Sequence, residues 1–443
     1  MVSNIIYDEK NDNLYLLIYK LGKGSYATVW FSIQLKGFVN NIKTKKKIDL
    51  HHYALKVHNE EDYDEGMLET KIDSYLSKNG KRSELINYPK SHFVYDESIV
   101  VVVYETALCS LYDFHKIYKR NFEEEFVNKI TPYLRESINF VHDCGFIHGD
   151  IKPENYLLMG TNKLQNDIYN DILKFNIMSK ISIINILKKK INYENIIQVF
   201  KPVLKQLLLE LTSSFNLSDN ILYDEDDSEH TDESSSSSSY ESSYDENDYS
   251  YEESEFYNTD CESYNSSENE FTKEYDKFHI NKILYEYYSE DNKSEDNKQD
   301  NKQQNNNDEN YEFIKKYLEN PIIKLTDFGL MKKQTDKCRT IQTRYYRAPE
   351  VLLGCKYDKN IDFWSLTCTI YELNTGKILF DVEKNIYNKK IDKDVIQIKL
   401  ILEYLKDHDM VAYWHIYTLI KENAPRIGAF LNKDGCYKQY RKL

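Results

Sequence analysis

Two glycines in a strand-rich stretch mark a place where the backbone could approach an anion. The segment 21–29 reads Leu-Gly-Lys-Gly-Ser-Tyr-Ala-Thr-Val and lies at a predicted turn between two strands. Because glycine has no side chain, backbone N–H groups beside it can come close to phosphate oxygens. Many hairpins that bind nothing also contain two glycines, and Ala27 stands where the usual phosphate-binding pattern has a third. This segment alone does not distinguish a ligand site from an ordinary turn.

A lysine inside an apolar strand is the second chemical feature. Lys56 lies in the run Tyr-Ala-Leu-Lys-Val at 53–57. An ammonium group there is costly unless an anion lies close to it, and the phosphates of ATP would supply one. Glu69, on the next predicted helix, could orient the lysine through an ion pair. Glu65 is the alternative, because the register of that helix is open.

The most specific pattern begins at residues 146–158, which read Phe-Ile-His-Gly-Asp-Ile-Lys-Pro-Glu-Asn-Tyr-Leu-Leu. Three further segments follow it, Lys-Leu-Thr-Asp-Phe-Gly at 324–329, Arg-Tyr-Tyr-Arg-Ala-Pro-Glu at 344–350 and Asp-Phe-Trp-Ser at 362–365. In this order they resemble the catalytic loop, the metal-binding segment and the activation segment of protein kinases. The resemblance covers residues 14–160 and 320 to about 405, and it implies an ATP-dependent protein kinase.

The resemblance implies roles for individual residues, with ATP and Mg2+ as cofactors. Asp150 would be the catalytic base and Lys152 the phosphate contact, while Asn155 and Asp327 would bind magnesium. The ATP-binding residues would be Leu21, Gly22, Lys23, Gly24, Ser25, Val29, Ala54, Lys56, Glu69, Glu105, Ala107 and Leu157, with Tyr104 as gatekeeper and 105–107 as the hinge. The substrate loop would contain Arg347, Pro349 and Glu350, and Asp362 would support the catalytic loop from below.

Three motifs are similar to the SR-protein kinases, which phosphorylate serines in Arg/Ser-rich segments. They are Ala-Thr-Val-Trp at 27–30, Ile-Lys-Pro-Glu-Asn at 151–155 and Thr-Ile-Gln-Thr-Arg at 340–344. A long insert between the catalytic loop and the metal-binding segment is a further similarity. Splicing and dual-specificity kinases remain alternatives, because Asp-Phe-Gly at 327–329 and Ala-Pro-Glu at 348–350 differ from the usual sequences of SR-protein kinases. The resemblance implies a serine/threonine kinase with a basic or Arg/Ser-rich protein substrate.

Gly149 stands where many kinases have an arginine that binds a phosphate on the activation loop. Without that arginine the phosphate has no evident charge partner, so we expect activity that does not require activation-loop phosphorylation. The alternative is a weakened enzyme. A pseudokinase or scaffold that binds nucleotide or partners without turnover therefore stays open as a second function. The Arg-Ala-Pro-Glu segment disfavours a small-molecule or lipid kinase.

The strands and helices predicted around these residues indicate an α+β, bilobal protein-kinase fold. Residues 13–36 and 52–58 predict strands, 61–76 a helix and 99–104 a buried strand. A longer helix is predicted from one apolar stripe, interrupted by Pro132 and formed by Phe126, Ile130, Leu134, Ile138 and Val141. The expected divisions are an N-lobe with hinge at 1–107, a first part of the C-lobe at 108–160, an insert at 161–320 and a shortened second part of the C-lobe at 321–443.

The predicted insert changes character along its length. Residues 163–215 keep a helical period, whereas 219–309 are rich in Ser, Asp, Glu and Asn and have no apolar period. Between Asp224 and Glu270 there are 18 acidic residues and no Lys or Arg, so this segment is strongly acidic and the rest of the chain, whose net charge is −15 in total, is nearly neutral. Such a segment buries too little apolar surface to offset its ordering entropy, which predicts disorder. It is either a solvated linker or a regulatory tail that competes with basic substrates.

Composition and charge exclude several other classes. The acidic balance argues against direct nucleic-acid binding. Seven scattered cysteines lack the close pairs of zinc or redox sites. The first residues lack a signal-peptide pattern, and the apolar run at 100–103 is too short to cross a bilayer. We expect a monomeric, intracellular protein, cytoplasmic or nuclear, that does not bind membranes.

The C-terminal segment is the least regular part of the pattern. Past Glu403 the sequence shows no counterpart of the kinase family's final helices. Arg426, after Pro425, is a candidate for the late arginine that pairs with Glu350 in the family. The C-lobe is then either shortened and stabilised in another way, or the chain is a truncated product with impaired folding.

Overall fold

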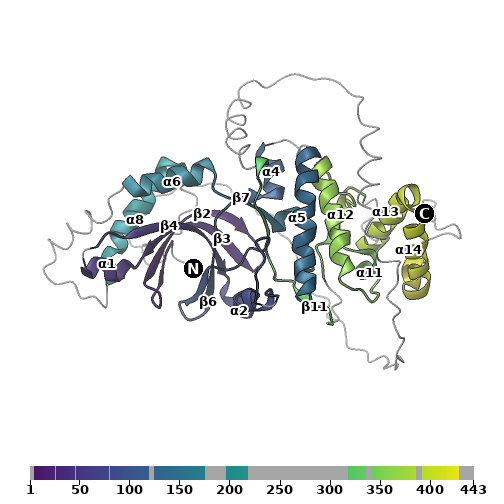
Figure 1. Ribbon diagram of the computed structural model, residues 1–443, viewed down its shortest axis with the longest axis horizontal. Helices are drawn as coiled ribbons and strands as arrows, with labels where there is room; N and C mark the ends of the chain where they lie inside the picture. Colours follow the sequence, from purple (N-terminus) through teal and green to yellow (C-terminus); the bar gives the residue numbers. More distant parts are fainter. Residues whose placement is uncertain are drawn as a thin grey trace, which may run out of the picture. The chain divides into compact units, whose positions relative to one another are not determined.

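The structure is a computed structural model and describes residues 4–24, 26–44, 46–78, 80–118, 124–174, 196–217, 318–335, 341–385 and 392–428. Its first part is a six-stranded antiparallel sheet with the strand order β1-β2-β3-β4-β6-β5 (Figure 1). The strands are β1 (Ile5–Asp8), β2 (Asn13–Lys23), β3 (Ala27–Lys36), β4 (Asp49–His58), β5 (Ser91–Tyr95) and β6 (Ile99–Tyr104). The predicted strands and hairpin are confirmed, whereas β1 and the short helix α1 (Phe38–Thr44) had no counterpart in the prediction.

The sheet curls until its two edge strands, β1 and β5, come into contact. Alternate side chains fill the inside of the curl, where the rings of Tyr15 and Phe93 stack with centroids 5.6 Å apart. The other face is continuous from end to end, because Phe31 pairs with Ala54 and Ala54 pairs with Tyr104 across neighbouring strands. Residues that are predicted to bind ATP therefore share this second face with the apolar residues of β2 and β3.

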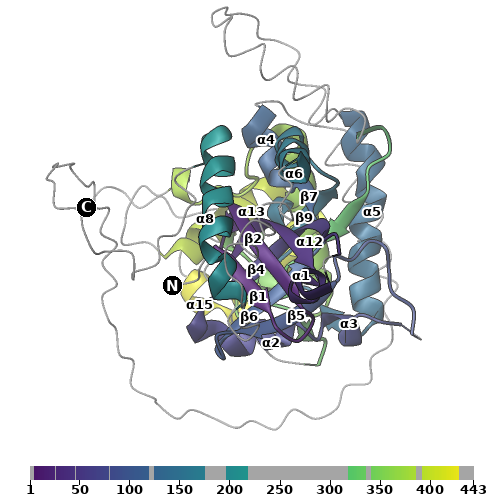
Figure 2. The same ribbon diagram turned by 90° about the vertical axis from the view of Figure 1, so that its left-hand side faces the viewer.

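Two helices from the predicted insert, α6 (Lys163–Lys174) and α8 (Ile196–Ser214), cover part of that second face (Figures 1 and 2). The helix α6 begins with a capping box, in which the backbone N–H of Asn162 donates to Gln165 Oε1 and that of Gln165 donates to Asn162 Oδ1. Phe200 of α8 is fully buried and meets Phe38 edge to face at 6.0 Å. The helical part of the insert thus completes the core of the sheet, which periodicity alone did not predict.

The single helix predicted for 61–76 is two short helices, α2 (Tyr63–Glu69) and α3 (Ile72–Tyr75). Thr70 and Lys71 form a turn between them. Leu68, on α2, is 55% exposed.

The second part of the chain is helical, with two small sheets beside it. The predicted stripe lies in α5 (Glu124–Asp143), where all five of its residues are buried and Pro132 lies inside the helix. The other helices are α4 (Leu111–Tyr118), α11 (Pro349–Leu352), α12 (Asn360–Thr375), α13 (Lys393–His408), α14 (Met410–Asn423) and α15 (Pro425–Gly428). The short strands are β7 (Ala107–Ser110), β8 (Phe146–Ile147), β9 (Tyr156–Met159), β10 (Ile323–Leu325) and β11 (Lys332–Lys333). These elements confirm the α+β fold class.

The helix α14 lies past Glu403, where no counterpart of the kinase family's final helices was expected. Its residues Tyr413, Ile416 and Ile420 are buried against α13 in one apolar cluster. Asp409 caps it by accepting hydrogen bonds from the backbone N–H groups of Val411 and Ala412.

The acidic segment at 219–309, predicted to be disordered, lies outside the described residues. Among the helices that are described, none combines the length and the apolar character that crossing a membrane requires.

Phe200 provides a test of the packing of α8 on the sheet. Phe200→Ala should lower the free energy of unfolding by about 3–5 kcal/mol, since it removes a fully buried ring and leaves a cavity. Leu209→Ala in the same helix is the matched control, because Leu209 is 48% exposed and should cost roughly 1 kcal/mol or less. Urea denaturation measures both, and an equal loss for the two variants would contradict the packing.

Candidate active site

Lys56 joins the sheet, the helix α2 and the segment after β10 through two ion pairs. Its Nζ lies 2.8 Å from Oε2 of Glu69 and 3.2 Å from Oδ1 of Asp327. Burial alone would raise the pKa of the Glu69 carboxyl, but Lys56 and His58 outweigh that effect and lower the pKa to about 2. Burial lowers the pKa of Lys56, and the two carboxylates reverse this and raise it. Lys56 and Glu69 are therefore both charged at neutral pH.

The structure decides between the two glutamates on α2. Glu69 is buried and faces Lys56, whereas Glu65 is exposed. Gly66, on the same helix, allows the close approach to the sheet, because a Cβ at this position would lie 2.7 Å from Cβ of Val100. A glycine in the middle of a helix costs helix stability, and here the close packing explains its presence.

The predicted phosphate-binding segment lies at the turn between β2 and β3. Backbone N–H of Gly24 donates to the carbonyl of Ala27 at 2.9 Å, and Gly22, Lys23 and Gly24 are exposed. Ser25 lies outside the described residues. Among the predicted apolar walls, Ala54 is buried, whereas Leu21, Val29 and Leu157 are half-buried. Leu21, Val29, Ala54 and Tyr104 belong to one apolar cluster.

The predicted hinge is tied to its surroundings by polar contacts. The exposed Glu105 side chain accepts a hydrogen bond from Lys324 Nζ at 2.9 Å. The carbonyl of Ala107 accepts from Nε2 of Gln165, on α6, at 3.3 Å. A helix of the insert therefore contacts the hinge as well as the sheet, and the sequence contained no signal for this contact.

The catalytic loop brings Asp150 and Lys152 together. Lys152 Nζ lies 2.7 Å from Asp150 Oδ2, and the Thr343 hydroxyl donates to Asp150 Oδ1 at 2.6 Å. Lys152 also donates to the Thr343 hydroxyl at 3.1 Å. Burial would raise the pKa of Asp150, but Lys152 and Thr343 outweigh it and lower the pKa, so the group is a carboxylate at neutral pH. Sequence analysis gave Thr343 no role of its own, although it lies in one of the motifs.

Asn155 and Asp327 offer oxygen atoms of the kind that magnesium prefers. The Asn155 amide nitrogen donates to Asp150, both to its carbonyl at 2.7 Å and to Oδ2 at 3.1 Å, which leaves the amide oxygen as an acceptor. The Asp327 side chain is 45% exposed. Two protein oxygens suffice for magnesium when phosphates and water complete its shell. This pair fits that pattern, and no set of three or more His, Cys, Asp or Glu that could hold a metal occurs within the described ranges.

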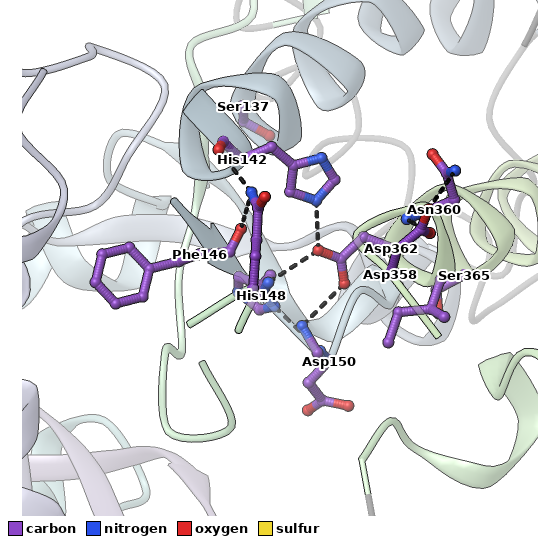
Figure 3. A network of polar contacts seen from close by, with 12 residues as sticks. Ser137, His142, Phe146, His148, Asp150, Asp358, Asn360, Asp362 and Ser365 are labelled. Atoms are coloured by element: carbon purple, nitrogen blue, oxygen red, sulfur yellow. Dashed lines mark hydrogen bonds and ion pairs between the residues drawn. The ribbon is translucent and has the colours of Figure 1, made fainter. Parts of the chain in front are cut away.

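Asp362, at the start of α12, holds the backbone of the catalytic loop (Figure 3). Its carboxylate is fully buried and accepts hydrogen bonds from the backbone N–H groups of His148 at 2.8 Å and Gly149 at 2.9 Å. The Nε2 atom of His142, on α5, lies 2.8 Å from the same carboxylate. The carboxylate thus joins two helices to the loop, which is the support that the sequence predicted for this residue.

Gly149 has no room for a side chain. Its φ is +78°, and a Cβ would lie 2.6 Å from Cδ1 of Ile341 and 3.1 Å from the carbonyl of Leu330. Ile341 is itself buried in an apolar cluster with Ile147 and Ala348. Both the backbone conformation and the packing therefore require glycine at this position.

The predicted substrate loop follows directly on Thr343. Arg347 donates to the carbonyl of Gln342 at 3.0 and 3.3 Å, and Pro349 is the first residue of α11. Burial raises the pKa of Glu350. The side chain of Arg426 lies outside the described side chains, so its pairing with Glu350 stays a prediction.

Gln342 is a buried residue that sequence analysis did not single out. Its Nε2 donates to the carbonyl of Ile361 and to the hydroxyl of Ser365, and its Oε1 accepts from the backbone N–H of Ala348. Its φ of +71° is unusual for a residue with a side chain. Three hydrogen bonds hold this conformation, which no local sequence signal predicts.

Comparison with known proteins agrees with this geometry. The family described as "Protein kinase domain" matches residues 15–174 and 313–416, more than half of the chain. The serine/threonine-protein kinase SRPK of Physarum polycephalum is 42% identical over 95 residues, which are 20% of this chain and 21% of that protein. A protein of Acanthamoeba polyphaga mimivirus, named "Putative serine/threonine-protein kinase", is 25% identical over 407 residues, 83% of this chain and 68% of that protein.

A shorter similarity connects the chain to another group of kinases. The dual specificity tyrosine-phosphorylation-regulated kinase 3 of Rattus norvegicus is 49% identical over 61 residues, which are 14% of this chain and 10% of that protein. The chain therefore spans about a fifth of the length of the Physarum relative and a tenth of the rat relative.

Replacing Asp362 tests the support of the catalytic loop. Asp362→Ala should lower the free energy of unfolding by about 3–5 kcal/mol, because it leaves two buried backbone N–H groups without an acceptor. Asp143→Ala is the control, since Asp143 is exposed and forms a surface ion pair with Lys78 worth roughly 0–1 kcal/mol. Urea denaturation gives both values, and a loss below about 1 kcal/mol for Asp362→Ala would show that the carboxylate is not needed.

Proposed function

The chain belongs to the protein kinase family, and we propose that it transfers the γ-phosphate of ATP to a serine or threonine of a protein substrate. The observation that carries this proposal is the position of Lys56 between Glu69 and Asp327. In the proposed reaction, Lys56 contacts the α and β phosphates, and the ion pair with Glu69 keeps its ammonium in place. Magnesium, when bound by Asp327 and Asn155, neutralises charge on the phosphates.

The catalytic loop supplies the groups for the transfer itself. Asp150, a carboxylate at neutral pH, accepts the proton of the substrate hydroxyl. Lys152 lies beside it and stabilises negative charge on the transferred phosphoryl group. The Thr343 hydroxyl bridges both groups, and it fixes their spacing before any substrate binds.

The substrate we propose is a basic, Arg/Ser-rich protein segment. The support is the similarity of three motifs to the SR-protein kinases and the match to a Physarum kinase named SRPK. The match to a dual specificity kinase covers a shorter stretch and leaves tyrosine as an alternative acceptor. The substrate loop at 344–350 favours a peptide over a small molecule as the acceptor.

Substitution of the proposed base tests this function. Asp150→Asn should lower the transfer of labelled γ-phosphate from Mg-ATP to an Arg/Ser-repeat peptide about 10²–10⁴-fold, because the amide cannot accept the proton. Asp143→Asn makes the same change at an exposed position and should keep the wild-type rate. If the folded wild-type protein transfers phosphate neither to this peptide nor to general basic proteins, the pseudokinase alternative replaces the proposal.

We also propose that activity does not require a phosphate on the activation segment. Ile341 occupies the space beside Gly149, and the segment is held by Gln342 and by an ion pair between Arg344 and Asp394 at 2.6 Å. These contacts need no phosphate. Treatment with a phosphatase should therefore change the rate of peptide phosphorylation less than about twofold, relative to a mock-treated sample. A loss of more than tenfold would contradict this part of the proposal.

A further inference from the structure

The two oxygens of the Glu69 carboxylate have different partners. Oε2 lies 2.8 Å from Lys56 Nζ and 3.1 Å from Nε2 of His58. Oε1 accepts a hydrogen bond from the hydroxyl of Tyr104 at 2.5 Å. Tyr104 is the last residue of β6 and is 6% exposed. Burial and the nearby Glu69 raise the pKa of Tyr104, so its hydroxyl keeps its proton and donates at neutral pH.

The helix that carries Glu69 is too short to fix the carboxylate by itself. It has seven residues, Glu69 is the last of them, and helices this short are marginal in water without tertiary contacts. Gly66 brings the helix close to β6 but contributes no side chain to hold it. The position of Glu69 therefore depends on the groups that contact its carboxylate.

We propose that Tyr104 is a positioning residue for Lys56: its hydroxyl holds Oε1 of Glu69, so that Oε2 stays directed at the Lys56 ammonium. Tyr104 and Glu69 thus orient the Lys56 ammonium before nucleotide binds. The inference rests on the proposed function, because it assigns Lys56 to the phosphates of ATP. It adds a hydrogen bond between the gatekeeper and the glutamate to the expected Lys56–Glu69 pair.

Removing the hydroxyl tests the proposal with little change in volume. Tyr104→Phe leaves a buried carboxylate oxygen without its donor, and kcat/KM for ATP should fall roughly 5- to 100-fold. KM for the peptide should stay within twofold, because the hydroxyl of Tyr104 donates to Glu69 and the proposal gives it no part in peptide binding. A fall that appears equally in the KM of the peptide would indicate a general structural defect and overturn the proposal.

Tyr15→Phe is the matched control. Tyr15 lies in the same sheet, is fully buried and accepts a hydrogen bond from Gln34 at 2.8 Å. Its hydroxyl thus has a buried polar partner, but that partner is not Glu69. The control should keep kcat/KM for ATP within about twofold of the wild type, and a loss equal to that of Tyr104→Phe would overturn the proposal.

A double-mutant cycle shows whether Tyr104 acts through Glu69. In a Glu69→Ala background, the further change Tyr104→Phe should have no effect on kcat/KM for ATP, since the acceptor is already gone. If Tyr104→Phe causes its full loss in this background as well, the hydroxyl acts through another group and the proposal is wrong.

Hydrogen exchange separates this inference from the proposed function. In the nucleotide-free full chain, Tyr104→Phe should increase amide exchange in residues 63–69 several-fold, whereas Tyr15→Phe should not. This result is expected even if the protein shows no phosphoryl transfer, in which case the proposed function fails and the positioning contact stands. Exchange in 63–69 that is unchanged by Tyr104→Phe overturns the positioning role.

Discussion

The active site depends first on one buried negative charge, the carboxylate of Asp362. A carboxylate with no exposure to water is stable only if donors surround it, and here these are two backbone N–H groups and the ring of His142. These N–H groups belong to His148 and Gly149. The buried carboxylate needs them as hydrogen-bond donors, and this need constrains the path of the catalytic loop. Asp150 is the next residue, so its position follows from that constraint.

A second buried carboxylate, that of Glu69 on α2, contacts side chains of the sheet. It differs from Asp362 in its partners, which are side chains rather than backbone: Lys56, His58 and Tyr104. Backbone donors are fixed by the fold, whereas Glu69 lies on the short helix α2 and its side-chain donors lie on β4 and β6 of the sheet. The geometry of the catalytic loop is therefore built in, while the geometry around Lys56 depends on a few contacts.

The sequence predicted those parts of the site that are local in the chain. The loop at 146–158 carries Asp150, Lys152 and Asn155 within six residues, and the structure places them together. The sequence could not decide between Glu65 and Glu69. The choice depends on the residue at which α2 ends and on the close approach of Gly66 to β6. The packing of α6 and α8 on the sheet was also missed. A helical period shows that a helix has an apolar face but not which surface covers that face.

Apolar contacts and neutral hydrogen bonds hold the part of the activation segment beside Gly149. An arginine at position 149 would require a backbone other than φ +78°, and its side chain would displace Ile341. The strained conformation of Gln342, at φ +71°, costs about 1–3 kcal/mol, and its hydrogen bonds to Ile361, Ser365 and Ala348 offset that cost. The apolar contact of Ile341 and these hydrogen bonds involve no phosphate, and they hold residues 341 and 342 of the segment. Thr343 follows directly on Gln342, and the same anchor therefore also sets the hydroxyl that bridges Asp150 and Lys152.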